Sequence, residues 1–349
     1  MDSPSKDSPR IEMRNVCKQF GQATVIDHVS LSVAPGTIYG FIGPSGSGKT
    51  TVIRLLTGVY GPSEGDIRVF DKAPTKWSRR DREHVGYMPQ FFVLYPTLSI
   101  SENVDFAAST YGMGWWSRRA PKRQLLEFVG LWEDRNKLAS SISGGMQRRL
   151  ELVCSLIHNP DLLFLDEPTA GIDPVLRATI WEHLNHLRNE KKTLFVTTQY
   201  VTEAEYCDRV GLINEGRIIA DGTPDDLRRK AYGGQVVTLT YARLNDALRD
   251  RLEAMPEVVD RTMKFISRDT AQMVVNDAAT AIPLILRQLE DAGIPMESVR
   301  ITEEKPPFDD VFVRLIEQAK PRPMEPSGEE GEARLTEQTG EEVDRARAA

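Results

Sequence analysis

The chain lacks the long apolar stretch that a membrane-spanning helix requires. No apolar run approaches the ~20 residues needed to cross a bilayer. The N-terminal stretch 1–10 is polar and has no apolar core, so it is predicted to be a disordered leader and not a secretion signal. If the protein works at a membrane, another chain is therefore expected to carry the spanning helices.

The chain also has few cysteines and no excess of positive charge. The 349 residues include three cysteines, Cys17, Cys154 and Cys207, which lie far apart and form no C-x-x-C pair. Isolated thiols in odd number argue against a disulfide framework and favour a reduced, cytosolic compartment. The formal net charge of -7 provides no overall positive field, so nucleic acid is not expected as a partner.

A glycine-rich segment gives the strongest positive signal. Residues 43–50 read Gly-Pro-Ser-Gly-Ser-Gly-Lys-Thr, which fits the G-x-x-x-x-G-K-S/T pattern of a phosphate-binding P-loop. The segment follows a strand-like run at 37–42 and opens a helix-like run at 51–56, which is the context that the motif requires. With Gly at about 7% of average composition, an accidental Gly/Ser turn would give this string in only about one chain in a hundred of this size. The sequence therefore predicts a nucleotide-binding protein.

The residue types of this loop suit a phosphate group. Glycines allow the backbone N–H groups to point inward, and the start of the following helix adds a partial positive charge. Lys49 can reach the β- and γ-phosphates, and the Thr50 hydroxyl can hold Mg²⁺. The predicted nucleotide contacts of the loop are Gly43, Pro44, Ser45, Gly46, Ser47, Gly48, Lys49, Thr50 and Thr51.

The remainder of the first two thirds predicts a parallel α/β core. The runs Leu162–Leu165 and Thr193–Val196 are apolar almost throughout, as expected for strands whose two faces are both covered by helices. Residues 91–140 show helical periodicity and no convincing strand, which predicts a helical insertion. Further expected elements are strands at 11–16, 24–33 and 65–70, a helix at 173–190, a hairpin at 210–220 and a helix after Thr223.

The pattern restarts at about residue 236. Strand, helix, two strands, helix and strand follow in turn, which predicts a small α+β ferredoxin-like domain over 236–319. Its elements are expected at 235–240, 245–255, twice between 263 and 275, at 278–290 and at 298–302, with a closing helix at 308–318. Residues 320–349 are rich in Pro, Gly and Glu and nearly free of aliphatic side chains, so they are predicted to be a disordered acidic tail.

Motifs downstream of the P-loop narrow the class of nucleotide-binding protein. Residues 143–147 read Ser-Gly-Gly-Met-Gln, residues 162–169 read Leu-Leu-Phe-Leu-Asp-Glu-Pro-Thr, and residues 171–174 read Gly-Ile-Asp-Pro. With these motifs in this order, residues 11–234 resemble the nucleotide-binding subunit of ABC (ATP-binding cassette) transporters. The resemblance implies a P-loop NTPase cassette with an antiparallel β subdomain, and ATP and Mg²⁺ as ligands.

The chemistry of ATP hydrolysis explains the acidic pair Asp166–Glu167, which follows the apolar run at 162–165. Phosphoryl transfer to water depends mostly on positioning and charge neutralisation. Thr50 and Asp166 are expected to hold Mg²⁺. Glu167, one residue past a strand end, can orient or deprotonate the attacking water, a role that contributes about 10²–10⁴-fold. The alternative, a solvated acidic turn, is disfavoured by the four apolar residues that precede the pair.

The resemblance assigns further roles to matching residues. Gln90 matches the Q-loop, which is expected to contact the Mg²⁺ site and the nucleotide, and Phe20 stands where the family stacks an aromatic ring on adenine. The signature residues Ser143, Gly144 and Gly145 are expected to bind the γ-phosphate held by a second subunit, and Asp173 matches the D-loop. Two copies of the chain are therefore expected to enclose two ATP molecules. If the family resemblance is set aside, Ser143 is predicted only to be a helix N-cap.

Two positions depart from the common family pattern. Met146 stands where the family usually has Gln, which removes a side-chain hydrogen-bonding group. Gln199 stands where many members have a His that senses the γ-phosphate, so hydrolysis is expected to depend little on pH near 6.5. Residues 197–205 and 306–312 resemble the drug-exporter branch, whose subunits pair with an ABC-2 type permease.

Several side chains have two open interpretations. His183 and His186 lie three apart on one helix, but nothing completes a metal site, so a solvated or core-edge role is favoured. The aromatic run 91–95 and the pair at 115–116 fit either core packing or a groove that receives a cytoplasmic helix of a membrane partner. The arginine pairs at 79–80 and 148–149 are predicted to be solvated faces, with contacts to acidic lipid or a partner as the alternative.

The sequence therefore predicts the ATP-hydrolysing subunit of an exporter, held at the cytoplasmic face of the membrane by a separate integral-membrane permease. The transported molecule would be drug-like, lipid or otherwise hydrophobic. One alternative is a soluble cassette ATPase acting on ribosomes or DNA, which the single cassette, acidic balance and lack of a heptad arm disfavour. The other alternative is a regulator that binds ATP without hydrolysing it. The intact Lys49, Asp166 and Glu167 disfavour this alternative, but Met146 leaves it open.

Overall fold

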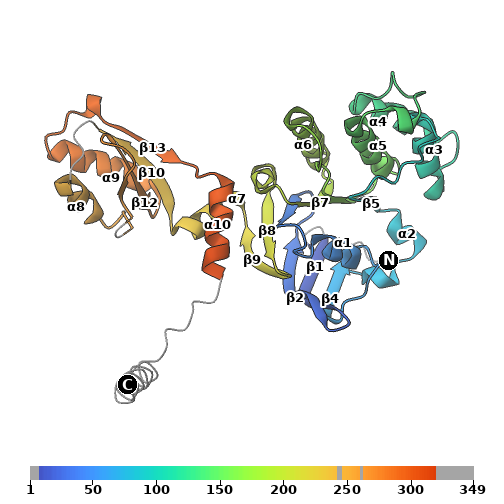
Figure 1. Cartoon of the computed structure of the whole chain (residues 1–349), viewed down its shortest axis with the longest axis horizontal. Coiled ribbons are helices and arrows are strands. Elements are labelled where there is room, and N and C mark those ends of the chain that lie inside the picture. The colour runs from blue at the N-terminus through green and yellow to red at the C-terminus, as the bar shows by residue number, and fades with distance from the viewer. Residues whose placement is uncertain (1–7, 242–245, 260–261, 320–349) are drawn as a thin grey trace, which may run out of the picture. The chain divides into compact units, whose positions relative to one another are not determined.

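A computed structural model describes residues 8–241, 246–259 and 262–319 of the chain (Figure 1). The predicted leader falls mostly outside these ranges, and the predicted tail falls entirely outside them. The described chain contains three sheets: a six-stranded sheet, a three-stranded sheet and a four-stranded sheet.

The six-stranded sheet carries the P-loop. Its order is β5-β6-β7-β3-β8-β9, and all neighbouring strands are parallel except the last pair, β8 and β9. The strands are β3 (Ile38–Ile42), β5 (Val85–Met88), β6 (Leu162–Asp166), β7 (Thr193–Thr198), β8 (Arg209–Asn214) and β9 (Arg217–Gly222). Every residue of β3, β6 and β7 is buried, which is why these segments are mostly apolar, with Asp166 and the threonines of β7 as the polar exceptions.

Alternate residues of these strands enter two separate cores. On one face, Leu163 and Leu165 pack with the helix α6 (Pro174–Asn189). On the other face, Leu162 and Phe164 pack in the same core as α1 (Lys49–Leu56). Figure 1 shows α1 and α6 on opposite sides of the sheet. The sheet is thus a rigid layer whose carboxyl edge holds the P-loop and the acidic pair.

The antiparallel sheet that was predicted near the N-terminus shares the core of α1. It has the order β2-β1-β4, with β1 (Ile11–Phe20), β2 (Ala23–Val33) and β4 (Glu64–Val69). Its apolar face contributes residues such as Ile11, Val29 and Val69 to that core.

The helical insertion forms a core of its own. Its helices are α3 (Ile100–Thr110), α4 (Arg119–Phe128) and α5 (Gly144–Leu156), which bury Val104, Leu126 and Leu150 together. The short elements α2 (Arg79–Arg82) and β5 precede the insertion and were not predicted. Four residues are too few to show a periodic pattern, and β5 is defined by its pairing with β6. Short 3₁₀ helices lie at η1 (Pro74–Lys76), η2 (Ala139–Ser141), η3 (Val201–Tyr206) and η4 (Met296–Ser298).

The last sheet confirms the ferredoxin-like prediction. It has the order β11-β12-β10-β13, with every neighbouring pair antiparallel. Each β-α-β unit is therefore split by a strand of the other unit, which is the ferredoxin-like arrangement. Its elements are β10 (Gln235–Thr240), α8 (Asp246–Glu253), β11 (Lys264–Phe265), β12 (Thr270–Val275), α9 (Ala278–Asp291) and β13 (Arg300–Glu304).

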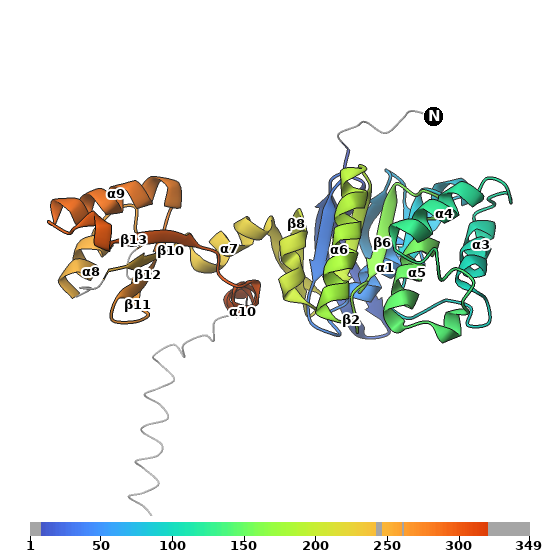
Figure 2. The same ribbon diagram turned by 90° about the horizontal axis from the view of Figure 1, so that it is seen from above.

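After this domain the chain returns to the cassette. The helix α7 (Pro224–Tyr232) leads out, with Thr223 as its predicted N-cap in a capping box. The helix α10 (Phe308–Ala319) follows the domain, and its side chains Phe308, Val311 and Leu315 join the α6 core. Both views show α10 close to α7 (Figure 2). This return was not visible in the sequence, because an amphipathic helix does not specify which surface it covers.

Candidate nucleotide-binding and catalytic site

The P-loop joins β3 to α1 in a conformation that requires glycine. A Cβ at Gly43 would lie 2.2 Å from the carbonyl oxygen of Ile213 on the neighbouring strand β8. Gly48 has φ of 105° and is the N-cap residue of α1, a left-handed conformation that other residues rarely adopt. The pocket at this loop is lined by Val25, Ser45, Gly46, Gly48, Lys49, Thr50, Thr51, Gln90 and Glu167. The loop, the Q-loop glutamine and Glu167 therefore meet at one place.

Lys49 is buried at the start of α1 and makes three polar contacts. Its Nζ donates to the carbonyl oxygens of Gly43 at 2.9 Å and Pro44 at 3.0 Å. It also lies 3.5 Å from Oε1 of Glu167. Burial lowers the pKa of Lys49 below its usual value, and the nearby Glu167 carboxylate opposes that shift. A phosphate group would give this desolvated ammonium a stronger anionic partner than the loop carbonyls.

Glu167 is held in a strained backbone conformation. Its φ is 50°, in the left-handed region, which costs about 1–3 kcal/mol for residues other than glycine. The backbone N–H of Glu167 donates to the carbonyl oxygen of Thr197 at 3.0 Å, and its side-chain Oε2 accepts from Nε2 of Gln90 at 3.1 Å. The strain turns the carboxylate out of the line of β6 and toward Lys49 and Gln90.

Asp166 ends β6 with one oxygen unsatisfied. Its Oδ1 accepts a hydrogen bond of 2.6 Å from the Thr197 hydroxyl, whereas Oδ2 is buried and has no hydrogen-bond partner within the described residues. Buried polar atoms are almost always paired, so a free carboxylate oxygen indicates a place for a cation. Thr50, Gln90 and Asp166 offer only oxygen ligands of the kind that Mg²⁺ prefers.

Phe20, at the end of β1, offers an exposed ring. Tyr60 meets it edge to face, with 5.2 Å between the ring centroids. The Nζ of Lys18 lies 5.1 Å from the Phe20 ring and 5.5 Å from the Tyr60 ring. The free face of Phe20 is suited to stacking on a flat base. Tyr60 and Lys18 support this ring but were not singled out by the sequence motifs.

The signature residues lie outside the P-loop pocket and act as helix caps. The Ser143 hydroxyl accepts from the N–H of Met146 at 3.3 Å at the start of α5, and Asp173 Oδ1 accepts from the first turn of α6. Gly144 has open space around it. Ser143, Gly144 and Asp173 are all exposed. The predicted N-cap role of Ser143 is therefore present in the single chain.

Gly145 and Gln199 complete the set of predicted contacts, and neither lines the P-loop pocket. A Cβ at Gly145 would lie 2.1 Å from the end of the Leu176 side chain, so α5 and α6 approach closely here. Gln199 follows β7 directly and is exposed.

The structure corrects the prediction for Arg148, which was expected to be solvated. Its side chain is 2% exposed and ion-paired with Glu151 at 2.9 Å. The guanidinium also donates to three carbonyl oxygens, those of Pro89 at 3.1 Å, Pro168 at 3.2 Å and Glu167 at 2.6 Å. Glu151 in turn accepts from the N–H of Val93. One buried pair on α5 thus joins the signature helix to the Q-loop and to the backbone of Glu167.

The aromatic run after Gln90 is a surface feature, so the core-packing interpretation is wrong. Phe91 is 78% exposed, and Phe92 and Tyr95 are also exposed. A groove beside this run is lined by Tyr87, Pro89, Val93, Leu94, Tyr95, Asn103, Phe106, Ala107, Thr110, Tyr111, Glu151, Cys154 and Ser155. Glu151 belongs both to this groove and to the Arg148 pair, so the groove is in direct contact with the network that reaches Glu167.

His183 and His186 occupy the edge of α6, as the favoured interpretation had it. The Phe128 ring lies 4.4 Å and 5.2 Å from the two imidazole rings, and His186 pairs with Glu190. Within the described ranges, neither histidine belongs to a group of side chains that could hold a metal ion.

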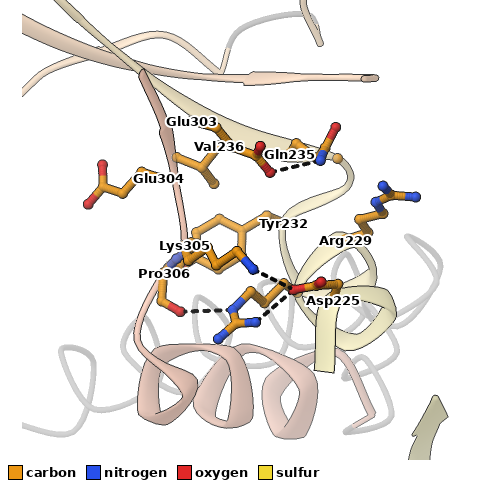
Figure 3. Close-up of a pocket in the computed structure, with 11 residues that line it drawn as sticks. Asp225, Arg229, Tyr232, Gln235, Val236, Glu303, Glu304, Lys305 and Pro306 are labelled. Carbon is orange, nitrogen blue, oxygen red and sulfur yellow. Dashed lines mark hydrogen bonds and ion pairs between the residues drawn. The ribbon is translucent and has the colours of Figure 1, made fainter. Parts of the chain in front are cut away.

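A second pocket lies where the C-terminal domain leaves and rejoins the cassette (Figure 3). Arg228 of α7 lies at its base, donating to Asp225 at 2.9 Å and to the carbonyl oxygen of Pro306 at 3.3 Å. Lys305 lies 3.6 Å from the same Asp225 carboxylate, and Gln235 donates to Glu303. These contacts join α7 to the segment that leads into α10, so the pocket is a structural junction.

Comparison with known proteins places the chain in a family. The profile of the ABC transporter family matches residues 26–170. The chain is 38% identical over 306 residues to the Nod factor export ATP-binding protein I of Paraburkholderia xenovorans, an alignment that covers 87% of this chain and 96% of that protein. The chain belongs to the ABC transporter ATP-binding family.

Two further comparisons define the extent of the similarity. The chain is 39% identical over 221 residues to the probable multidrug ABC transporter ATP-binding protein YbhF of Escherichia coli. This alignment covers 63% of the present chain but only 38% of that longer protein. The dimeric structure of a post-hydrolysis state of an ATP-binding cassette, bound to ADP and phosphate, matches with a TM-score of 0.56 and 25% identity. This match covers 61% of the present chain and 98% of that structure.

No helix in the described part of the chain is both long and apolar enough to cross a membrane.

Proposed function

We propose that the chain is the ATP-hydrolysing subunit of an ABC exporter. The observation that carries this function is the cluster at the end of the P-loop, in which the strained Glu167 carboxylate contacts both the Lys49 ammonium and the Gln90 amide. A protein that only binds nucleotide has no need for a carboxylate held at this point against backbone strain.

Each residue has a defined part in the reaction. The P-loop N–H groups and Lys49 bind the phosphates, and Thr50, Asp166 and Gln90 would hold Mg²⁺, which neutralises phosphate charge when bound. The Glu167 carboxylate accepts a proton from water as the water oxygen bonds to the γ-phosphorus. The bond from that phosphorus to the bridging oxygen of ADP then breaks, releasing phosphate. Gln90 orients Glu167 through its amide.

The second half of the site comes from another copy of the chain. Ser143, Gly144 and Gly145 lie at the N-terminus of α5, where free N–H groups attract anions. These groups do not line the P-loop pocket of their own chain, so they suit the γ-phosphate held by a partner copy. Asp173 lies at the equivalent point of α6. The dimeric state of the related cassette structure supports this arrangement.

The groove beside the exposed aromatic run is the proposed contact with the permease. It joins apolar rings to the Glu151 carboxylate, so a cytoplasmic helix seated there would contact the same pair that holds Glu167. Movement of the Q-loop during hydrolysis would thereby reach the permease. The proposed location of the protein is therefore the cytoplasmic face of the membrane, where the permease would hold it. Relatives named for Nod factor export and as a probable multidrug transporter support export, and the proposed cargo is a drug-like, lipid or other hydrophobic molecule.

The catalytic assignment is tested with Glu167→Gln, which keeps the side-chain shape and removes the base. Glu190→Gln, an exposed substitution at the end of α6, is the matched control. ATP binding should persist in both, whereas turnover should fall about 10²–10⁴-fold only in Glu167→Gln. Turnover within threefold of wild type would show that Glu167 is not the base.

The partner is tested by purifying tagged Glu167→Gln from gently solubilised membranes with ATP and Mg²⁺. A stoichiometric multi-spanning protein is expected. The double change Phe91→Ser and Tyr95→Ser should lose that protein while retaining ATP binding. Recovery with ribosomes or nucleic acid, or with no partner, would overturn the transporter function.

A further inference from the structure

The loop between α3 and α4 presents two tryptophan side chains to solvent. Trp115 is 56% exposed and Trp116 is 77% exposed. Trp77 and Trp181, by contrast, are buried in the cassette cores. Adjacent exposed tryptophans are unusual on a soluble surface, because each leaves a large apolar ring in water. The pair does not serve the nucleotide site, since neither ring lines the P-loop pocket.

The loop is held in place, so that the rings stay outward. Arg118 donates to the carbonyl oxygens of Asp105 at 2.7 Å and Met113 at 2.9 Å, and to the Ser109 hydroxyl at 2.8 Å. These bonds tie both ends of the turn to the last turns of α3. The backbone that carries the two tryptophans is therefore tied to α3.

Positive charge surrounds the two rings. Residues 112–123 contain four basic side chains and no acidic one. Arg118 and Lys122 pair with Asp105 and Arg123 pairs with Glu127, so Arg119 is the main cation that this loop presents to solvent. The Arg119 guanidinium is exposed and lies 4.3 Å from the Trp116 ring centroid and 5.8 Å from that of Trp115. The nearby helix α2 adds more basic residues, since an Arg79 nitrogen lies 2.8 Å from where a Gly112 Cβ would be. A partner for this surface must be both anionic and partly apolar.

We propose that the loop of residues 112–119 contacts the anionic headgroup layer of the membrane. Tryptophan prefers the boundary between headgroups and acyl chains, and arginine binds phosphate through a planar fork of donors. Basic residues near an anionic leaflet each strengthen partitioning by roughly fivefold at physiological salt. The arrangement of ring and guanidinium matches both layers of that boundary at once.

The position of the loop in the fold agrees with a membrane contact. Thr110 and Tyr111, which directly precede the loop, line the aromatic groove. A permease helix seated in that groove would bring the loop beside the rim of the permease, where lipid headgroups lie. Because the groove is assigned to the permease only under the function proposed above, this placement depends on that function.

Vesicle binding by the full-length protein tests the contact directly. Vesicles of phosphatidylglycerol and phosphatidylcholine in equal parts are compared with pure phosphatidylcholine by co-sedimentation. Binding should require phosphatidylglycerol and weaken as salt rises. Brominated acyl chains should quench part of the tryptophan fluorescence, since only the exposed rings reach the lipid. Equal binding to both kinds of vesicle would overturn the proposal.

Matched variants locate the contact on the molecule. Trp115→Ser combined with Trp116→Ser should weaken vesicle binding at least tenfold, and Arg119→Gln should weaken it roughly fivefold. Phe265→Ser combined with Ile266→Ser, an exposed apolar pair in the C-terminal domain, should leave binding unchanged. Circular dichroism and melting temperature confirm that each variant is folded. Unchanged binding by the double tryptophan variant would overturn the proposal.

The permease assay separates the two levels of failure. The double tryptophan variant should retain ATP turnover and still co-purify with the permease through the groove. Loss of the permease without any loss of vesicle binding would assign the loop to the protein partner and overturn the lipid contact. Failure of wild-type protein to recover any permease, with vesicle binding intact, would count against the proposed function and leave the lipid contact standing.

Discussion

The two halves of the nucleotide site differ in how far the single chain completes them. At the P-loop, Glu167 already contacts both Lys49 and Gln90 in a largely buried cluster. At the signature end, Ser143 and Asp173 are exposed and satisfy only their own helices. One half is therefore assembled by folding, whereas the other consists of a pair of helix caps, to which the proposed function adds the phosphate of a second subunit. The chain can fold without committing to the dimer.

The largest expected effect breaks the assembled half. Lys49→Ala removes the cation of the P-loop, and loss of one such stabilising donor typically lowers turnover by about 10²–10³-fold. ATP affinity should fall as well, because the lysine binds the phosphates in the ground state. Equilibrium binding of a fluorescent ATP analogue, measured beside steady-state turnover, checks both. Binding as tight as in wild type would show that the lysine does not reach the phosphates.

The next prediction addresses the exposed half alone. Ser143→Ala should lower turnover at least tenfold and reduce ATP-dependent dimerisation, while ATP affinity of the monomer stays within about twofold of wild type. Loss of the N-cap should lower the free energy of unfolding by about 1 kcal/mol. Ser141→Ala, two residues earlier and exposed, is the control. If ATP affinity falls as far as in Lys49→Ala, the two halves are not separate in the monomer.

Arg148 connects the two halves, and its replacement should lower the free energy of unfolding. Arg148→Met leaves the buried Glu151 carboxylate unpaired, which should cost about 3–5 kcal/mol of unfolding free energy. Arg148→Met combined with Glu151→Leu should recover most of that loss, as replacement of a whole buried pair often does. Turnover should stay low in the double variant, because the carbonyl group of Glu167 has lost its donor. Denaturant unfolding and ATPase assays separate these effects.

The smallest effect concerns the junction of α5 with the strand that leads to the Q-loop. His158 contacts the Val85 carbonyl oxygen at 3.0 Å and stacks on Tyr111, and burial lowers its pKa to about 4. Between pH 6.5 and 4 the unfolded chain takes up a proton at His158 that the folded chain does not. This residue therefore lowers stability as pH falls through that window, by up to about 1.4 kcal/mol per pH unit.

His158→Phe should make the melting temperature less sensitive to pH over the same window. Thermal unfolding of both proteins at several values between pH 7 and 5 provides the comparison. His186→Phe, at an exposed position on α6, is the control and should follow wild type. Identical slopes for wild type and His158→Phe would show that this imidazole is not held neutral by burial.

The features predicted best from the sequence are those that depend on residues adjacent in the chain. The P-loop and the Asp166–Glu167 pair are short motifs beside apolar strands, and their local conformation follows from glycines and burial. Arg148 was misplaced because its burial depends on carbonyl groups of Pro89 and Glu167, which are distant in sequence. A signal was present, since Arg148 and Glu151 are oppositely charged and three apart on the side of α5 that also carries Leu152.

Other misses have the same origin. The exposure of Phe91 could not be decided, because an apolar residue after a strand is compatible with either a core or a groove. The strand β5 is too short for periodicity and exists through pairing with β6. The orphan oxygen of Asp166 and the positive φ of Glu167 are properties of three-dimensional packing, and no pattern of residue types displays them.

Because α10 returns to the cassette, the C-terminal domain is an insertion in the cassette and not an extension at its end. Because Phe308, Val311 and Leu315 complete the α6 core, the ferredoxin-like domain is an insert between two parts of one hydrophobic core. An insert fastened at both ends closes a loop, which restricts its freedom far more than a terminal extension would. A chain shortened to residue 234 would expose the apolar faces of Ala220, Leu227 and Ala231, so removal of this domain would also uncover part of the cassette core.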